Sequence, residues 1–281
     1  MSGVRRPGLP SMQLSNQHVL ITGGSSGIGL ALARQAAAQG ARISLVARDR
    51  AKLVAAREEI LRLVPGAFAV GLASADVANQ SDLLRALAEA ERTHGPVDVL
   101  ITSAGIARPG YFEEVPVDIF ERAMAVNYFG TLYAVKAMVP GMKQRGRGAV
   151  VIVSSGAGLV GLFGYTAYSP TKFALRGLAE SLRAELKSTG VRVAIVYPPD
   201  TDTPQLVEEN RTKPAETKAL TAAGGLWSAD EVARVTLAGL ARGKFSITPG
   251  FQLTALAWLH SLFAPILRWH FDRLAVRARR T

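Results

Sequence analysis

Apolar and polar positions along the chain form two alternating patterns. Short, continuous apolar runs, which predict buried β-strands, occur at residues 18–21, 42–47, 67–72, 97–102, 149–154, 191–197 and 245–248. Longer segments with helical spacing of apolar residues lie between them, at 30–39, 51–63, 80–93 and 116–143. Apolar strands that alternate with helices are typical of a parallel sheet covered by helices on both faces. We therefore predict an α/β fold of the doubly wound, Rossmann type.

Two segments interrupt this alternation. Residues 198–226 form a long polar stretch, and loops of this length in compact domains are usually lids or binding loops. Ser228 followed by Glu231 has the spacing of a capping box, so we expect a helix to begin there. Residues 251–281 are first apolar and then basic. We expect a flexible N-terminus (1–14), one nucleotide-binding and catalytic domain (15–250) and a helical C-terminal tail (251–281).

The first predicted strand leads into the glycine-rich segment 22–29, and a helix follows it. Gly23, Gly27 and Gly29 allow a tight turn, a close approach of backbone to a pyrophosphate, and close packing of helix on strand. The free N–H groups and the dipole of the helix then favour phosphate. Because the glycines follow a strand and open a helix, the segment predicts a dinucleotide site.

The end of the second strand indicates which dinucleotide binds. An acid at this position would bind the ribose 2′-hydroxyl of NAD, whereas an arginine can bind a 2′-phosphate. Ala47 and Arg48 occupy the strand end. We therefore expect NADP(H), with Ser25 as a second phosphate contact. The alternative is that Arg48 is solvated and Asp49 binds the ribose.

A tyrosine and a lysine stand four residues apart, at Tyr168 and Lys172, and share one face of a helix. A phenol titrates near about 10 when unperturbed. A cation at roughly 4 Å in a partly screened site would stabilise the phenolate by about 4 kcal/mol. Such a pair suits acid–base catalysis. Ser155 lies 13 residues before Tyr168, at the end of a predicted strand.

Composition excludes several other kinds of chemistry. The 281 residues contain no cysteine, which excludes disulfides, thiolate metal sites and a cysteine nucleophile. The formal net charge is +11, and residues 268–281 hold five arginines against one aspartate. This basic segment follows an apolar, tryptophan-bearing stretch, which favours an anionic membrane surface over nucleic acid. We expect no metal site and no nucleic-acid partner.

Over residues 15–250 the chain resembles the short-chain dehydrogenase/reductase family. The matching motifs are the glycine-rich segment 22–29, Ser-Ala-Gly at 103–105, Asn127, Ser155, Tyr168 with Lys172, and the stretch 198–203. The sequence departs from the family at two of these positions. Ser103 stands where Asn is usual, and Pro199 stands where Gly is usual.

The resemblance implies a catalytic set and a set of cofactor contacts. Tyr168 would donate a proton to a carbonyl oxygen, and Lys172 would lower the pKa of Tyr168 and hold the nicotinamide ribose. Ser155 would bind the substrate oxygen, and Asn127 would position a water. The implied cofactor contacts are Gly23, Ser25, Ser26, Gly27, Ile28, Gly29, Arg48, Lys52, Asp76, Val77, Ala104, Gly105, Tyr168, Lys172, Pro198, Thr201 and Thr203.

A narrower resemblance concerns the polar stretch. Segments 197–204, 208–214 and 216–217 are similar to those of one group within the family, the 3-ketodihydrosphingosine reductases. This implies NADPH-dependent reduction of the 3-keto group of 3-ketodihydrosphingosine to dihydrosphingosine, in sphingolipid biosynthesis. Glu208, Glu209 and Glu216 are candidate partners for the substrate's ammonium. A reductase of another hydrophobic ketone, such as a steroid, and a non-catalytic NADP(H)-binding protein remain as alternatives.

Partners and location follow from the same features. The resemblance implies a long-chain keto-lipid substrate and a homo-oligomer, either a dimer or a tetramer. The N-terminal residues show no apolar run of a secretory signal. The apolar stretch 251–267 is shorter than the 20 or so residues that a membrane span needs. We expect a cytoplasmic protein that associates peripherally with an anionic membrane through residues 251–281.

Overall fold

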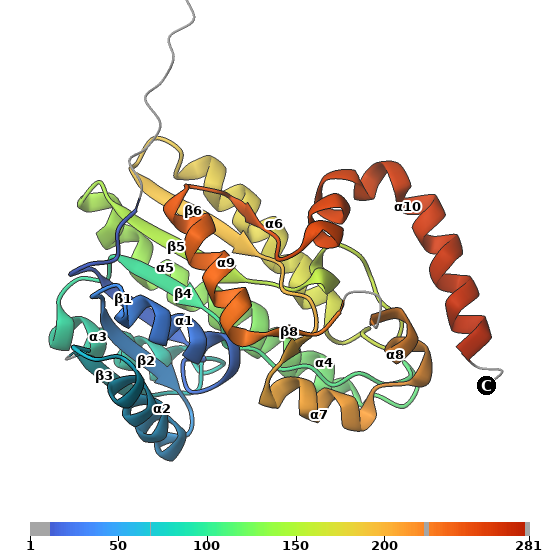
Figure 1. The fold of residues 1–281 in the computed structure, drawn as a ribbon, viewed down its shortest axis with the longest axis horizontal. Helices are drawn as coiled ribbons and strands as arrows, with labels where there is room; N and C mark the ends of the chain where they lie inside the picture. Colours follow the sequence, from blue (N-terminus) through green and yellow to red (C-terminus); the bar gives the residue numbers. More distant parts are fainter. Residues whose placement is uncertain (1–11, 68, 222–224, 279–281) are drawn as a thin grey trace, which may run out of the picture.

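The computed structural model describes residues 12–67, 69–221 and 225–278, and its centre is a seven-stranded sheet (Figure 1). The strand order is β3-β2-β1-β4-β5-β6-β9, and all six pairings are parallel. The strands are β1 (His18–Thr22), β2 (Arg42–Ala47), β3 (Val70–Ser74), β4 (Val99–Thr102), β5 (Gly148–Val153), β6 (Val191–Val196) and β9 (Ser246–Ile247). This confirms the doubly wound α/β fold. The order reverses between β1 and β4, so a crevice is expected at their carboxyl ends.

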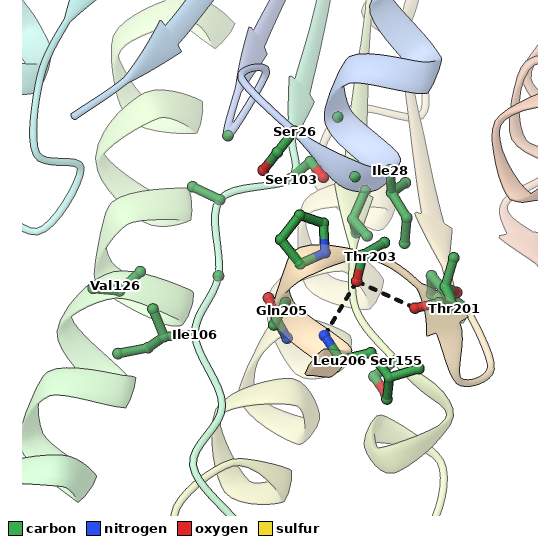
Figure 2. A pocket seen from close by; sticks show the side chains of 18 of the residues that line it. Ser26, Ile28, Ser103, Ile106, Val126, Ser155, Thr201, Thr203, Gln205 and Leu206 are labelled. Carbon is green, nitrogen blue, oxygen red and sulfur yellow. Dashed lines mark hydrogen bonds between the residues drawn. The ribbon is translucent and has the colours of Figure 1, made fainter. Parts of the chain in front are cut away.

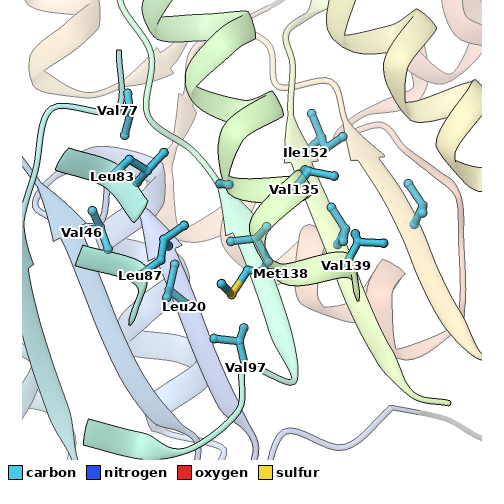
Figure 3. Packing of buried hydrophobic residues seen from close by; sticks show 14 of the residues in the cluster. Leu20, Val46, Val77, Leu83, Leu87, Val97, Val135, Met138, Val139 and Ile152 are labelled. Carbon is cyan, nitrogen blue, oxygen red and sulfur yellow. The ribbon is translucent and has the colours of Figure 1, made fainter. Parts of the chain in front are cut away.

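Helices cover both faces of the sheet and bury two apolar clusters. On one face lie α1 (Gly27–Ala37), α2 (Arg50–Leu63) and α9 (Ala229–Ala241). On the other lie α3 (Gln80–His94), α5 (Gly130–Gln144) and α6 (Ser169–Glu185). Figure 3 shows the second cluster, in which Leu83 and Leu87 from α3 and Met138 from α5 lie against the sheet. Burial on both faces explains why the central strands read as continuous apolar runs.

The third strand begins three residues later than the sequence predicts. Residues 64–67 form a turn in which the Ala67 N–H donates to the Val64 carbonyl at 3.1 Å, and Gly66 has φ +85°. The turn ends α2 and uses the residues expected at the start of the strand. Residue 68, within the predicted strand 67–72, lies outside the described residues.

The polar stretch 198–226 is not the loop that the sequence indicates. It holds β7 (Thr201–Asp202), α7 (Pro204–Thr212) and α8 (Ala215–Thr221), while residues 222–224 lie outside the described part. β7 pairs with β8 (Trp227–Ser228), and α9 begins at the expected capping box. Helix α7 forms because Thr203 accepts a hydrogen bond from the Leu206 N–H and Pro204 occupies the first turn.

The two ends of the chain differ from each other. Residues 1–11 lie outside the described residues, but Leu14 is buried and the Met12 N–H donates to the Ala241 carbonyl at 3.2 Å. Residues 12–14 thus contact the domain, and the flexibility of segment 1–14 stays a prediction. The helical tail is present as α10 (Phe251–Ala278), which extends away from the sheet edge and packs on α8 (Figure 1). No helix within the described ranges is long and apolar enough to cross a membrane.

The segment between β4 and β5 completes the fold. It comprises α4 (Val117–Ala123), a six-residue π-helical segment (Met124–Phe129) and α5. The predicted helix 116–143 is thus continuous but widens in the middle. Such widened turns often occur at functional sites. A short 3₁₀ turn (Gly156–Gly158) follows β5.

Candidate active site

A pocket of about 320 Å³ opens at the carboxyl ends of the central strands, where the sheet topology predicts a crevice (Figure 2). All seventeen residues that the sequence predicts as cofactor contacts line it. They come from the segments that follow β1, β2, β3, β4 and β6 and from the start of α6. Residues as far apart in the chain as Gly23 and Thr203 therefore share one cavity.

The glycine-rich turn lies at one wall of the pocket. Gly23 has φ +70°, and a Cβ added there would come within 2.6 Å of the Ala104 nitrogen. A Cβ on Gly29 would collide with the Gly23 carbonyl oxygen. Side chains are therefore excluded, and the backbone at the start of α1 is left open to a ligand. This is the geometry that a pyrophosphate requires, so the turn fits a dinucleotide.

The charged residues beyond β2 favour a 2′-phosphate. Asp49 caps α2, and its carboxylate accepts a hydrogen bond from the Lys52 N–H at 3.1 Å. Its carboxylate is thus already engaged as a helix cap. Arg48 and Lys52 both line the pocket and supply positive charge at this end. The residues present fit NADPH better than NADH.

Tyr168 is the N-cap residue of α6 and Lys172 lies in its first turn, with the Lys172 Nζ 5.3 Å from the centroid of the Tyr168 ring. Both side chains are buried, and the Lys172 Nζ donates to the Val153 carbonyl at 3.2 Å. Pro170 occupies the first turn, where its missing N–H costs nothing. Ser155 follows β5, and its Oγ accepts from the Ala157 N–H at 3.2 Å.

The pKa shifts of Tyr168 and Lys172 differ from the expectation that Lys172 lowers the pKa of Tyr168. Burial raises the pKa of Tyr168, as does the nearby Glu209 carboxylate, while hydrogen bonds with Ser155 and Gln205 lower it. Burial lowers the pKa of Lys172 to about 8, and Glu209 opposes that shift. Tyr168 is therefore protonated at neutral pH. That is the state a proton donor to a carbonyl needs.

Asn127 does not line the pocket. It is buried in the π-helical segment, where its Oδ1 accepts from the Ile106 N–H at 2.8 Å. Its Nδ2 donates to the Ile106 carbonyl at 3.0 Å and to the Thr171 Oγ1 at 2.9 Å. Asn127 thus ties the segment after β4 to the start of α6. Its expected contact with a water stays a prediction.

Thr201 and Thr203 line the pocket in the segment before α7 and are hydrogen-bonded to each other. The Thr203 Oγ1 donates to the Thr201 carbonyl at 3.2 Å and accepts from the Leu206 N–H at 3.3 Å (Figure 2). Thr203 also lies against the glycine turn, because a Cβ added to Gly27 would come within 3.0 Å of its methyl group. Helix α7 therefore begins next to the glycine turn that is predicted to bind phosphate.

Tyr165 and Gln205 line the pocket but were missing from the site residues predicted from the sequence, whereas Glu209 was predicted as a candidate ammonium partner. The Tyr165 hydroxyl donates to the Glu209 Oε2 at 2.6 Å, and the Gln205 Nε2 donates to the Glu209 Oε1 at 2.8 Å. The four-residue spacing of Gln205 and Glu209 after Thr203-Pro204, a helix-start signal, could have placed both on one helix face.

The three candidate partners for an ammonium group, Glu208, Glu209 and Glu216, lie in different surroundings. Glu209 lines the pocket. The Glu208 side chain is 61% exposed and pairs with Arg211 at 2.9 Å. Glu216 is buried on α8, where it accepts from the Tyr111 hydroxyl at 3.1 Å. Of the three, Glu209 alone is placed to meet a ligand in this pocket.

A dinucleotide cradle next to a buried Tyr–Lys pair and a serine defines a carbonyl oxidoreductase. Comparison with known families agrees, and the chain belongs to the short chain dehydrogenase family, whose model matches residues 17–214.

Three relatives carry closely related names. A 3-dehydrosphinganine reductase of Danio rerio is 45% identical over 250 residues, covering 87% of this chain and 75% of the relative. A 3-ketodihydrosphingosine reductase of Bos taurus is 42% identical, covering 91% and 77%. One from Dictyostelium discoideum is 38% identical, covering 91% and 85%. These relatives carry the names of the group that the polar stretch 198–226 resembles, the 3-ketodihydrosphingosine reductases.

Among solved structures, levodione reductase is similar to this chain with a TM-score of 0.78 and 25% sequence identity. The match covers 86% of this chain and 99% of that one. The sheet and its helices therefore belong to a known architecture.

Proposed function

We propose that this protein is an NADPH-dependent reductase of 3-ketodihydrosphingosine, which it converts to dihydrosphingosine in sphingolipid biosynthesis. The observation that carries the proposal is the 45% identity with the Danio rerio 3-dehydrosphinganine reductase over 87% of this chain. The pocket supports it, because the Tyr168, Lys172 and Ser155 side chains meet there with the dinucleotide cradle.

The reaction needs one hydride and one proton. NADPH, when bound, supplies the hydride to the keto carbon. The Tyr168 hydroxyl donates the proton to the keto oxygen, and Ser155 stabilises the charge that develops on that oxygen. Lys172, held by the Val153 carbonyl, provides positive charge beside the phenolate that Tyr168 becomes.

The substrate's alkyl chain needs an apolar path out of the pocket. Leu162, Leu206 and Ala157 supply apolar lining near Tyr168. The first turn of α10 lies nearby, since a Cβ added to Gly156 would come within 3.0 Å of a Leu253 methyl. We propose that the chain leaves the pocket on the α10 side.

We also propose that the protein is cytoplasmic and associates peripherally with an anionic membrane through residues 251–281. Support comes from α10, where Phe251 is 85% exposed and Trp258 is 83% exposed. Arg273 lies over the Trp269 ring, 4.0 Å from its centroid, which joins a cation to an interfacial aromatic. The side chains of residues 268, 279 and 280 lie outside the described ones.

A homo-oligomer, dimer or tetramer, is the remaining proposal. It is supported by exposed apolar side chains around α4 and the π-helical segment: Phe112, Val117 and Phe129. Sedimentation velocity of the detergent-solubilised protein measures the assembly. A monomer at micromolar concentration would contradict it.

The activity test follows NADPH oxidation with 3-ketodihydrosphingosine in detergent or vesicles. We expect turnover by the wild type and a loss of about 100-fold or more in kcat for Tyr168→Phe. Tyr133→Phe, outside the pocket, is the matched control and should keep wild-type turnover. Reduction of a steroid ketone, without reduction of 3-ketodihydrosphingosine, would favour a reductase of another hydrophobic ketone. NADPH binding without reduction of any ketone would favour a non-catalytic protein.

A further inference from the structure

Four carboxylates line the pocket, and they differ in which groups compensate their negative charge. Asp49 caps α2, as described above. Asp76 pairs with Arg122 at 2.6 Å, and Asp200 pairs with Lys213 at 3.0 Å. Glu209 forms no salt bridge with any residue in the described ranges.

Glu209 is nevertheless deeply placed, with 7% of the residue exposed. Its two oxygens accept hydrogen bonds from neutral groups, the Tyr165 hydroxyl at 2.6 Å and the Gln205 amide at 2.8 Å. Neutral donors orient the carboxylate but leave its charge uncompensated. Burial of such a charge is costly unless a cation joins it.

The nearest cations of the protein are committed elsewhere. The Lys213 Nζ is bound to Asp200 and lies 5.8 Å from the Tyr165 ring centroid. The Lys172 Nζ donates to the Val153 carbonyl and attracts the Glu209 carboxylate through space, but the two form no salt bridge. Among the described residues no cation forms a salt bridge with Glu209, so the ammonium of a ligand can occupy that place.

Glu209 lies close to the reacting group. Gln205 links the two, because its amide donates to Glu209 and its side chain also hydrogen bonds with the Tyr168 phenol. The Tyr165 and Tyr168 ring centroids are 5.5 Å apart, so the donor to Glu209 adjoins the proton donor. Figure 2 shows Gln205 and Ser155 among the residues that line the pocket. One residue, either Gln205 or Tyr165, therefore separates the Glu209 carboxylate from the Tyr168 side chain.

We propose that Glu209 binds the ammonium group on the carbon next to the ketone, and so selects α-amino ketones over plain long-chain ketones. The proposal rests on the proposed function, since 3-ketodihydrosphingosine carries its amine on the carbon beside the keto group. Bound substrate also cancels the negative charge next to Tyr168, which eases formation of phenolate during proton donation.

The test compares two substrates with the same alkyl chain. One is 3-ketodihydrosphingosine, and the other is 1-hydroxyoctadecan-3-one, which lacks the amine. For Glu209→Gln, we expect kcat/KM on the amino ketone to fall on the order of 10- to 100-fold, because a charge-assisted hydrogen bond is lost. On the deamino ketone, the same variant should stay within about threefold of wild type.

Glu208→Gln is the matched control, because it removes the neighbouring carboxylate from the exposed face of α7. It should leave both substrates unchanged. Equal losses of Glu209→Gln on both ketones would overturn the Glu209 proposal while leaving the reductase activity in place. Wild-type protein that reduces neither ketone would overturn the proposed function itself.

A second measurement needs no variant and covers the case in which Glu209→Gln fails to fold. Dihydrosphingosine and octadecane-1,3-diol are compared as product inhibitors of the wild-type enzyme at neutral pH. We expect the amine to bind about tenfold or more tightly. Equal inhibition constants would contradict the proposal.

Discussion

At the scale of single residues, charge placement at the end of β2 sets the cofactor preference. Arg48 and Lys52 line the pocket there, while the Asp49 carboxylate is engaged by the Lys52 N–H. Two cations remain for a 2′-phosphate, and the acid that would bind a ribose hydroxyl serves as a helix cap.

We predict that Arg48→Ala lowers kcat/KM with NADPH on the order of 10- to 100-fold, because a charge-assisted contact to phosphate is lost. The value with NADH should hardly change. Steady-state kinetics with both cofactors measures this. Arg50→Ala, whose guanidinium bonds to the Leu72 carbonyl outside the pocket, is the control. An equal fall with both cofactors would argue against a 2′-phosphate contact.

The buried Lys172 gives a second prediction at this scale. Because burial lowers its pKa to about 8, the ammonium charge is present below that pH and lost above it. We therefore expect NADPH affinity to weaken as pH rises through about 8, measured by fluorescence titration. In Lys172→Met the affinity should be weaker and independent of pH over that range. A wild-type affinity that stays constant up to pH 10 or so would refute this role.

At the scale of elements, β1 is anchored at its first residue. The His18 ring lies 2.7 Å from the Gly95 carbonyl oxygen through Nδ1 and 2.9 Å from the Ser44 Oγ through Nε2. The His18 N–H donates to Asp98 at 3.0 Å. These contacts join β1, β2 and the segments before β4, and burial lowers the pKa of His18 to about 4.

This anchor predicts an acid-sensitive fold. Between pH 6.5 or so and about 4 the unfolded chain binds a proton that native His18 does not, so stability falls as pH is lowered. The full shift corresponds to roughly 3 kcal/mol of unfolding free energy. Urea unfolding at several pH values measures it. His18→Gln should show a shallower dependence over this interval, and an unchanged slope would exclude His18 as the cause.

At the scale of the whole molecule, α10 is the element that departs from the compact sheet and its helices (Figure 1). Its first turns pack on the core through Leu253, Leu256 and Ala257. Of its exposed aromatics, Phe251 is the first residue of the helix, and Trp258 and Trp269 lie further along. Leu253 in its first turn lies against Gly156, the residue between the pocket residues Ser155 and Ala157.

We predict that Trp258→Ala lowers affinity for anionic vesicles by roughly tenfold, since an indole supplies a kcal/mol or more of burial. Vesicle sedimentation measures the bound fraction, and turnover of detergent-dispersed substrate should be retained. Phe112→Ala, which removes a 67%-exposed aromatic before α4, is the control. Equal binding by the wild type and the Trp258 variant would exclude this helix as the contact.

The sequence by itself determined the features that depend on neighbouring residues. The strand–helix alternation, the glycines at 23, 27 and 29, and the spacing of Tyr168 and Lys172 all act within one or two elements. Short-range geometry fixes their consequences, so the fold and the dinucleotide cradle were predictable. The helix in the polar stretch was also signalled locally, by Thr203 before Pro204, although the polarity of the stretch concealed it.

Only the tertiary structure decided what long-range packing controls. It placed Asn127 behind the pocket wall, where it bonds to Ile106 and Thr171. It separated Glu209 from Glu208, although the two are neighbours in sequence. Burial sets pKa values and removes charges from water, and burial depends on residues brought together from distant parts of the chain. The balance of charge around Tyr168 therefore arises only when α6 and α7 meet.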